Sequence, residues 1–328
     1  MHDLAQDLAQ RVALGLAYPW QLVAGDAESK LWWPSVLASL VLAWVAVGGA
    51  RSWRRFRTLM LDAATWTSVS ARNDIWILLL NPLLQATILA AFVVDFRGLG
   101  SWVADMLRGL GVHGEAHDAA AVAWGLALTA ALFLVDDLAR WLTHYLQHRI
   151  PALWEFHKVH HSAEVLGFLT VQRHHPVDPL LTTAAIGIGV AVVNGVFIAL
   201  AGDHLTLWTL AGANVFRVVA NALGGVLRHS PFWVGFGPVV ERWIVSPAMH
   251  HIHHSGDPRH YDSNFGTSLS VWDRMAGTLL LSRGERVERF GIGEETAEFR
   301  TLRAIYLRPI VSAWRMLASR RQASSVQG

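Results

Sequence analysis

The sequence predicts an all-α integral membrane protein, a bundle of four or five membrane spans with a cytoplasmic helical cap rich in histidine. Hydrophobic residues make up 53% of the 328 residues and charged residues only 16%, which is too apolar for an ordinary soluble domain of this length. The apolar residues also gather into stretches long enough to cross a bilayer, which takes about 20 helical residues.

Composition excludes several classes of protein. The formal net charge is only +2 and the basic residues lie in short clusters, so no nucleic-acid-binding surface is indicated. The chain has no cysteine, which excludes disulfides, thiolate metal sites, iron–sulfur clusters and cysteine nucleophiles.

The N-terminal third is expected to hold an interfacial segment and two spans. Residues 1–30 have a mixed composition and are expected to form a short helix at the membrane surface. Within residues 31–118, apolar stretches at 32–50 and about 75–96 predict the first two spans, and a glycine-rich polar connection follows at 98–114.

The next segment, 119–282, is expected to form the catalytic domain. Its apolar stretches predict a third span at 119–134 and a transmembrane hairpin, 180–223, whose two arms are 180–201 and 205–223. Residues 283–328 are expected to form a cytoplasmic tail.

Basic residues set the expected orientation. The first predicted span is followed by Arg51, Arg54, Arg55 and Arg57, and basic residues beside a span favour the cytoplasm. The alternation of the spans then places all the histidine clusters on the cytoplasmic side, at or below the membrane face.

Histidines are concentrated in the predicted catalytic domain. Positions i, i+3 and i+4 of a helix share a face, so each cluster is expected to point its imidazoles in one direction. Pro151 and the pair Ser246–Pro247 are suited to start the helices that carry the second and third clusters. The clusters are His144 and His148; His157, His160 and His161; and His250, His253 and His254.

Such clusters predict a metal site. Neutral imidazole binds zinc, copper, iron and nickel. Eight ligands are too many for one tetrahedral zinc ion, whereas two metal ions with four or five nitrogens each would use them. Nitrogen-only ligation favours a strongly electrophilic oxidant, so the expected chemistry is oxygen activation beside a C–H bond.

The order and spacing of these residues resemble the fatty acid hydroxylase superfamily, which includes sterol desaturases and sphingolipid hydroxylases. The resemblance covers roughly residues 130–280. Besides the three clusters it rests on Asp137, Leu153–Trp154, Ser162, Arg173-x-His175–Pro176, His229, Ser246–Pro247, Asn264–Phe265–Gly266, Trp272–Asp273–Arg274 and Gly277–Thr278.

The resemblance implies an integral membrane di-iron enzyme that uses O2 and two electrons to hydroxylate or desaturate a lipid. It implies that the eight clustered histidines are catalytic metal ligands, with His229 as a ninth and His175 at a further matching position. The chain departs from the family at Tyr145, often arginine, and at Gly225, where some relatives have another histidine. Asn264, or a water molecule that it holds, is then a candidate for the tenth ligand.

Acidic residues near the motifs are candidates for orienting the ligands. A metal-bound imidazole usually donates its other N–H to a carboxylate or carbonyl, and Asp137 and Asp273 are placed for this role. Asp137 has the alternative of an ion pair with Arg140. The histidines expected to hydrogen-bond without binding metal are His174, His251 and His260, and His204 lies in the outer turn of the predicted hairpin.

Two other function classes stay open on the sequence. A zinc-dependent membrane hydrolase would need a glutamate as general base, and Glu155 and Glu164 flank the second cluster without the HExxH spacing. A metal transporter would carry ionisable ligands within its spans, whereas here the spans are free of them.

The expected partners follow from the predicted chemistry. The substrate is expected to be a membrane lipid, such as a fatty acyl lipid or sterol, and zinc is expected as a substitute for iron in purified protein. With no haem, flavin or cysteine motif in the chain, a separate cytochrome, ferredoxin or reductase would supply the electrons. Basic patches at 51–57 and 315–321 would dock an acidic carrier or anionic lipid. Composition points to a bacterial inner membrane.

Overall fold

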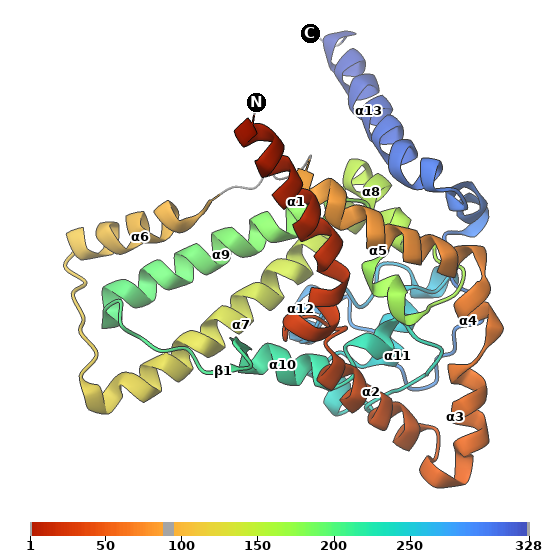
Figure 1. The fold of residues 1–328 in the computed structure, drawn as a ribbon, viewed down its shortest axis with the longest axis horizontal. Coiled ribbons are helices and arrows are strands. Elements are labelled where there is room, and N and C mark those ends of the chain that lie inside the picture. Colours follow the sequence, from red (N-terminus) through yellow and green to blue (C-terminus); the bar gives the residue numbers. More distant parts are fainter. Residues whose placement is uncertain (1, 88–94, 327–328) are drawn as a thin grey trace.

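The computed structural model describes residues 2–87 and 95–326 and is dominated by helices (Figure 1). Two short antiparallel strands, β1 (Thr209–Leu210) and β2 (Ala213–Asn214), form the one sheet of this region. The all-α prediction is therefore confirmed. The helices are α1 (His2–Trp20), α2 (Trp33–Ala46), α3 (Trp53–Met60), α4 (Ala63–Thr67), α5 (Val69–Thr87), α6 (Arg97–Gly109), α7 (Asp118–Arg149), α8 (Pro151–His161), α9 (Val177–Ala201), α10 (Val215–Ala222), α11 (Pro247–His253), α12 (Val271–Ala276) and α13 (Leu302–Val326).

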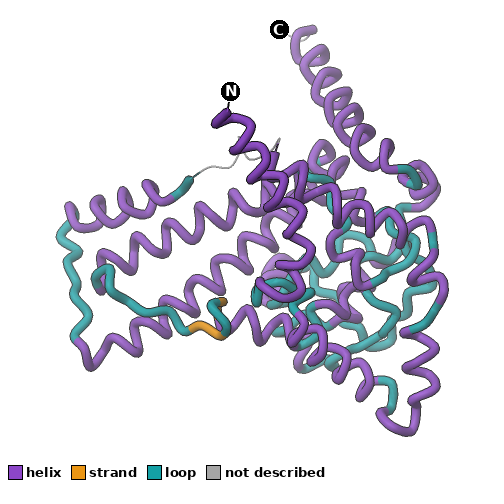
Figure 2. The backbone as a smooth tube through the Cα atoms, viewed as in Figure 1, coloured by secondary structure: helices purple, strands orange, loops and turns teal. Residues whose placement is uncertain are grey.

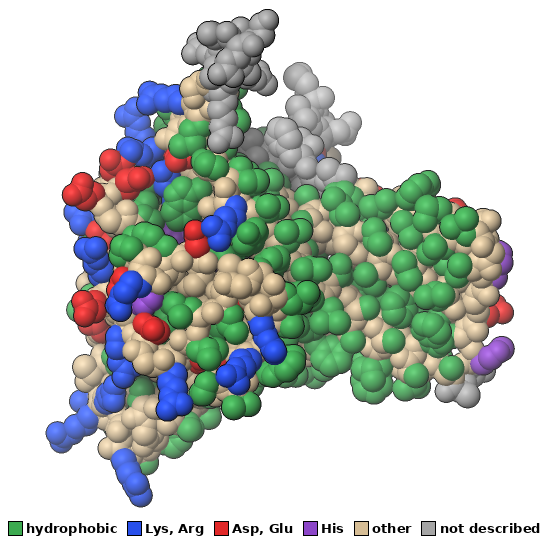
Figure 3. Space-filling model, turned by 180° about the vertical axis from the view of Figure 1, so that it is seen from behind, with side chains coloured by type: hydrophobic (Ala, Val, Ile, Leu, Met, Phe, Trp, Pro, Cys, Tyr) green, Lys and Arg blue, Asp and Glu red, His purple; other side chains and the backbone are tan. Residues whose placement is uncertain are grey.

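A layer of helices projects from one side of the molecule. The helices α7 and α9 are long and apolar enough to cross a membrane, and α6 packs along α9 (Figure 1). Hydrophobic side chains cover this part in Figure 3, whereas Lys, Arg, Asp and Glu gather at the opposite end. The separation of apolar from charged surface agrees with an integral membrane protein.

Within the described residues, fewer helices qualify as membrane spans than the four or five that the sequence predicted. Two helices of the described chain qualify, and a third does only if α2 and the helical segment Gly49–Thr67, bent by 80° at their junction, form one broken span. For the predicted span 75–96, α5 covers the first part, and residues 88–94 lie outside the described residues.

The prediction of a helical arm over 205–223 is wrong. After α9 the chain turns at Gly202 and runs extended through the β1–β2 hairpin, and α10 has only 8 residues. The extended segment bonds to α7: Trp208 N donates to Thr129 Oγ1 (2.9 Å), and Asn214 Nδ2 donates to the Thr129 carbonyl (2.8 Å). The first bond satisfies a backbone N–H that a helix would have satisfied internally, and the second ties the hairpin to α7.

The glycine-rich segment 98–114 is not a simple connection, because 97–109 form α6. Its glycines allow close packing instead of breaking the helix. A Cβ atom on Gly100 would lie 3.1 Å from the carbonyl oxygen of Ala191, and one on Gly195 would lie 2.5 Å from the carbonyl oxygen of Gly100. The absence of side chains thus lets α6 and α9 approach each other.

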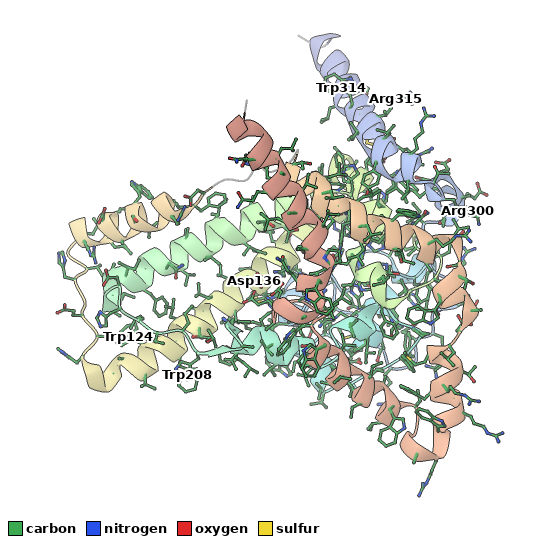
Figure 4. All side chains as sticks on the ribbon, in the orientation of Figure 1. Trp124, Asp136, Trp208, Arg300, Trp314 and Arg315 are labelled. Carbon is green, nitrogen blue, oxygen red and sulfur yellow. The ribbon has the colours of Figure 1, made fainter. Side chains whose placement is uncertain are left out.

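The helices α8 and α11, which carry the second and third histidine clusters, lie at the other end of the molecule, where most of the loops are found (Figures 1 and 2). Figure 4 shows Asp136 of α7 near this end and Trp124 near the far end of the same helix. The C-terminal helix α13, whose Trp314 and Arg315 are labelled there, packs against α8. Val159, Phe299 and Ile305 form a buried cluster at this contact, so the predicted tail helps to hold α8.

The close contact of α6 with α9 gives a test of the fold. Replacing Gly195 by Ala places a methyl group against α6 and should destabilise the protein by about 1–3 kcal/mol, as overpacking usually does. Gly98→Ala is the matched control, since nothing lies within 4 Å of its added Cβ. Thermal unfolding in detergent measures both variants, and equal midpoints would contradict the packing.

Candidate metal centre

Three helices position the clustered histidines. The pair on α7 lies in its last two turns, where the predicted continuation of the helix beyond the apolar stretch is confirmed. Pro151 is the first residue of α8, and Ser246 caps α11 by accepting a hydrogen bond from Met249 N. The predicted helix starts are therefore confirmed, and they fix where each motif begins.

Nine of the ten histidines predicted as ligands come together in two adjacent groups. One nitrogen of each ring lies within 4.8 Å of the corresponding nitrogens in its group. The five-histidine group is His144, His148, His157, His161 and His253, and the four-histidine group is His160, His229, His250 and His254.

Each HxxHH motif is divided between the two groups. The first and last histidines of the α8 motif join the five-histidine group, and its middle histidine joins the other; the α11 motif does the reverse. Positions i and i+4 differ by about 40° around a helix, whereas i+3 and i+4 differ by about 100°. The expectation that each cluster points in one direction is therefore wrong for the middle histidine, and the divergence lets two helices serve two sites.

The two groups differ in the number of nitrogen atoms that are added to those from α8 and α11. His144 and His148, one turn apart on α7, add two nitrogens to the five-histidine group. His229 alone performs this role in the four-histidine group, because the position one turn earlier is Gly225. The four-histidine group therefore offers one nitrogen atom fewer and is the more open of the two.

The nitrogen atoms of the four-histidine group are spaced as ligands of one ion. His229 Nε2 lies 3.1 Å from His250 Nε2 and 3.2 Å from the Nε2 atoms of both His160 and His254. Nitrogens at metal-bond distance from a common ion are roughly 2.9–3.4 Å apart for right to tetrahedral angles. The separations fit ligation of one ion.

The five-histidine group shows the same inward arrangement. His148 Nε2 lies 3.1 Å from His161 Nε2. The buried Nε2 atoms of His144, His157 and His253 form no hydrogen bond with any described residue. Buried polar atoms without partners are rare in folded proteins, and here a metal ion would supply the missing partner.

Four rings are oriented by hydrogen bonds from Nδ1, which leave Nε2 free to bind metal. Three of the acceptors are backbone carbonyls, and the fourth is the carboxylate of Asp178. The bonds run from His144 to Phe265 O (2.8 Å), His160 to Arg173 O (3.0 Å), His253 to Ser263 O (2.8 Å) and His157 to Asp178 Oδ2 (3.2 Å).

Burial keeps the clustered histidines neutral. Burial lowers the pKa of His253 to about 3, and that of the neighbouring non-ligand His251 to about 4. Burial also lowers the pKa of other histidines of the two groups well below the ordinary value, and repulsion from neighbouring histidines and basic residues lowers it further. These histidines are His160, His161, His229, His250 and His254. Protons therefore compete weakly with metal for these nitrogens at neutral pH.

Asp273 and Asn264 form hydrogen bonds with the backbone around the histidine groups. Asp273 accepts hydrogen bonds from the backbone N–H groups of Phe265 (2.9 Å) and Gly266 (2.8 Å), so it positions the carbonyl that orients His144. Asn264 Nδ2 donates to Met249 O and Leu280 O, and its Oδ1 accepts from Leu280 N. This side chain is engaged with backbone, so the structure does not place it as the tenth ligand.

Asp137 is not in contact with a ligand ring. Its carboxylate accepts from Ser268 N, Leu269 N and Trp272 Nε1 at 3.0–3.1 Å. The alternative pairing with Arg140 is also not seen, because Arg140 pairs with Asp136. Asp137 instead ties α7 to the loop before α12.

Sequence reasoning missed two carboxylates. Asp178, in the first turn of α9, is the carboxylate that orients His157; its place two residues after the matched Pro176 was the available signal. Glu241 is fully buried and accepts from Ser246 Oγ, Ser282 N and Ser282 Oγ. It holds the cap of α11, and no sequence pattern pointed to it.

His175 does not join the other predicted ligands. Its Nε2 donates to Tyr306 O (3.1 Å) and its Nδ1 accepts from Val177 N (3.2 Å), so both nitrogens are used. The histidines expected not to bind metal also lie outside both groups: His174, His251 and His260 bond to Val171 O, Leu227 O and Glu285, and His204 lies near Ala116 O.

Cavities lie on two sides of the centre. One of about 230 Å³ is lined by histidines of both groups and by Thr182, Thr183 and Ile186 of α9. A second of about 270 Å³ is lined by His148, His161 and His253 together with Trp154 and Tyr261. The first cavity borders α9, one of the helices of the span layer.

The two groups predict how metal content responds to substitution. The chain should bind two ions, and His160→Ala or His253→Ala should lower the content to one ion or fewer, because each removes a ligand that no neighbour replaces. His175→Ala and His204→Ala should keep both ions. Elemental analysis of purified protein tests this, and loss of metal in His175→Ala would restore that residue as a ligand.

The bond between Asp178 and His157 predicts an effect on affinity without loss of a ligand. Asp178→Ala should weaken metal binding about 10- to 100-fold, as removal of such orienting partners typically does. Asp178→Asn keeps an acceptor and should retain more of the affinity, while Asp203→Ala, in the exposed turn after α9, should change nothing. Titration against a competing chelator gives the constants; equal values for Asp178→Ala and the unsubstituted protein would refute the role.

Comparisons with known proteins agree with this geometry. Residues 129–278 match the family model described as fatty acid hydroxylase. The chain is 28% identical over 156 residues to ornithine lipid hydroxylase OlsE of Rhizobium tropici, covering 47% of this chain and 43% of that protein. It is 29% identical over 154 residues to an alkylglycerol monooxygenase of Xenopus tropicalis (45% and 29%) and 28% identical over 148 residues to human cholesterol 25-hydroxylase (44% and 48%).

The matched segment spans less than half the length of each of these relatives. No solved structure matches the chain. The resemblance seen in the histidine pattern is nevertheless confirmed, because residues 129–278, the segment that carries the histidines, match the fatty acid hydroxylase family model.

Proposed function

We propose that this protein is a membrane-bound di-iron oxygenase that hydroxylates a C–H bond of a lipid. The observation that carries the proposal is the pair of adjacent nitrogen-only groups with a cavity between them and the span layer. The relatives support it, because their names describe hydroxylation or monooxygenation of lipids.

The residues of the two groups would hold one iron ion each. Iron bound there would supply the oxidising power for the C–H bond. Overall, one C–H group, O2, two electrons and two protons would give one alcohol and one water. Desaturation needs the same oxidant and electrons, but the names of the relatives favour hydroxylation.

The chain would hold the metal ions and orient both the histidine rings and the lipid. The backbone carbonyls that accept from His144, His160 and His253 keep these rings in one tautomer. Residues of α9 in the first cavity would hold the lipid beside the open four-histidine group. Zinc would occupy the same nitrogens in protein purified without iron.

The proposal also includes the electron donor, the orientation in the membrane and the type of membrane. Electrons would come from a separate cytochrome, ferredoxin or reductase, docked at basic surface such as 51–57 or 315–321. The arginines after the first apolar stretch favour a cytoplasmic centre, and composition favours a bacterial inner membrane.

Contacts of the nearby glutamates speak against a zinc hydrolase. Glu155 pairs with Lys158 (2.8 Å), and Glu164 pairs with Arg300 (2.7 Å). A general base has to reach a metal-bound water, and both carboxylates are instead committed to ion pairs away from the two groups.

Labelling with ¹⁸O2 tests the proposal. Cells that express the chain, supplied with iron and grown under ¹⁸O2, should gain a lipid with one labelled oxygen, as detected by mass spectrometry. His160→Ala and His253→Ala should abolish the product, whereas His204→Ala should retain it. An unchanged lipidome, or oxygen derived from water, would contradict an oxygenase.

A further inference from the structure

The first cavity is lined by positively charged side chains that do not orient the histidine rings. Besides the histidines, its lining includes Lys30, Arg140 and Arg228. Lys30 lies outside the segment matched by the family model, in the turn between α1 and α2.

Arg228 is buried without a partner. Its side chain belongs to a residue only 3% exposed, its Nε is buried and unbonded, and no ion pair of the described residues includes its guanidinium. The residue directly precedes His229, so the charge reaches the cavity from the same turn as a ligand. Burying an unpaired guanidinium costs free energy that an anion in the cavity would offset.

Lys30 is held at the same cavity and is half-buried. Its segment is fixed because the Glu28 carbonyl accepts from Asn221 Nδ2 (2.7 Å) and Leu31 N donates to Ser29 Oγ (3.1 Å). None of the hydrogen bonds or ion pairs found among residues 2–87 and 95–326 includes the Lys30 ammonium. The other lysine of the chain, Lys158, pairs with two glutamates.

The carboxylates around the cavity have partners other than Lys30 and Arg228, although Oδ1 of Asp178 is buried without a hydrogen bond. Asp136, labelled on α7 in Figure 4, pairs with both Arg140 and Arg217. Asp137 accepts its three hydrogen bonds from the loop before α12 and the start of that helix, and Asp178 accepts from His157. Lys30 and Arg228 therefore have no direct carboxylate partner among the described residues, although Asp137 lies near enough to act on both electrostatically.

We propose that Lys30 and Arg228 bind the oxyanion of an anionic lipid substrate, a carboxylate or a phosphate, within this cavity. The inference rests on the proposed function and narrows its substrate class. A guanidinium and an ammonium donate several charge-assisted hydrogen bonds to such a group. An uncharged lipid would leave both cations desolvated and unpaired, so the cavity discriminates against it.

Binding of matched twelve-carbon amphiphiles tests the proposal on full-length, metal-free protein in detergent. The probes are dodecanoate, dodecyl phosphate and dodecanol, and equilibrium binding of the radiolabelled forms gives the dissociation constants. At least one anion should bind about tenfold or more tightly than the alcohol. The preferred anion identifies the source as a carboxylate or a phosphate.

Substitutions locate the preference. Lys30→Gln and Arg228→Gln should each reduce it about tenfold, since each removes charge-assisted bonds. Lys30→Arg should preserve it, and Arg242→Gln, at an exposed position away from the cavity, should leave it unchanged. Because Lys30 is less deeply buried than Arg228, its variants test the idea even if Arg228→Gln does not fold.

The outcomes separate this inference from the proposed function. Equal binding of the three probes, or full preference in Lys30→Gln, overturns the anion receptor even if lipid is still oxidised. An anion preference that depends on Lys30 supports the receptor. If it occurs in a protein that oxidises no lipid under ¹⁸O2, the receptor stands and the hydroxylase proposal falls.

Discussion

The arrangement of this protein depends on the mutual burial of nine imidazoles whose free nitrogens face one another. Neutral rings with converging lone pairs repel at short range and gain no hydrogen bond from one another unless one carries a proton. The fold must therefore hold them in place by other contacts. A bound cation then converts the least favourable part of the interior into the most strongly bonded one.

Those other contacts come mainly from the loops around the site. Backbone carbonyls of Phe265, Arg173 and Ser263 accept from ring N–H groups. Buried carboxylates in turn hold the loops and helix ends that supply the rings, as Asp273 does for Phe265 and Glu241 does for the cap of α11. Carbonyl acceptors carry no full charge, so the two histidine groups stay close to neutral and would compensate the positive charge of bound metal ions only weakly.

The sequence predicts those features of the fold and site that depend on residues close together in the chain. The histidine spacing, the helix starts at Pro151 and Ser246 and the length of α7 follow from residues close together in the chain. The hydropathy of segment 205–214 does not distinguish a helix from an extended chain, whereas its alternation of Leu with Thr favours extended structure. The packing role of Gly100 and Gly195 depends on the contact between α6 and α9, which the sequence does not reveal. The role of Glu241 and the backbone bonds of His175 depend on distant contacts that no local pattern records.

The division of each HxxHH motif between both groups has a thermodynamic consequence. A rotation or slide of α8 or α11 moves ligands of both groups together. An ion in either group therefore restricts the same two helices and removes part of the conformational freedom that its neighbour would otherwise have to restrict. The two positions are coupled, so filling should be cooperative, and chains with a single ion should be rarer than independent binding would give.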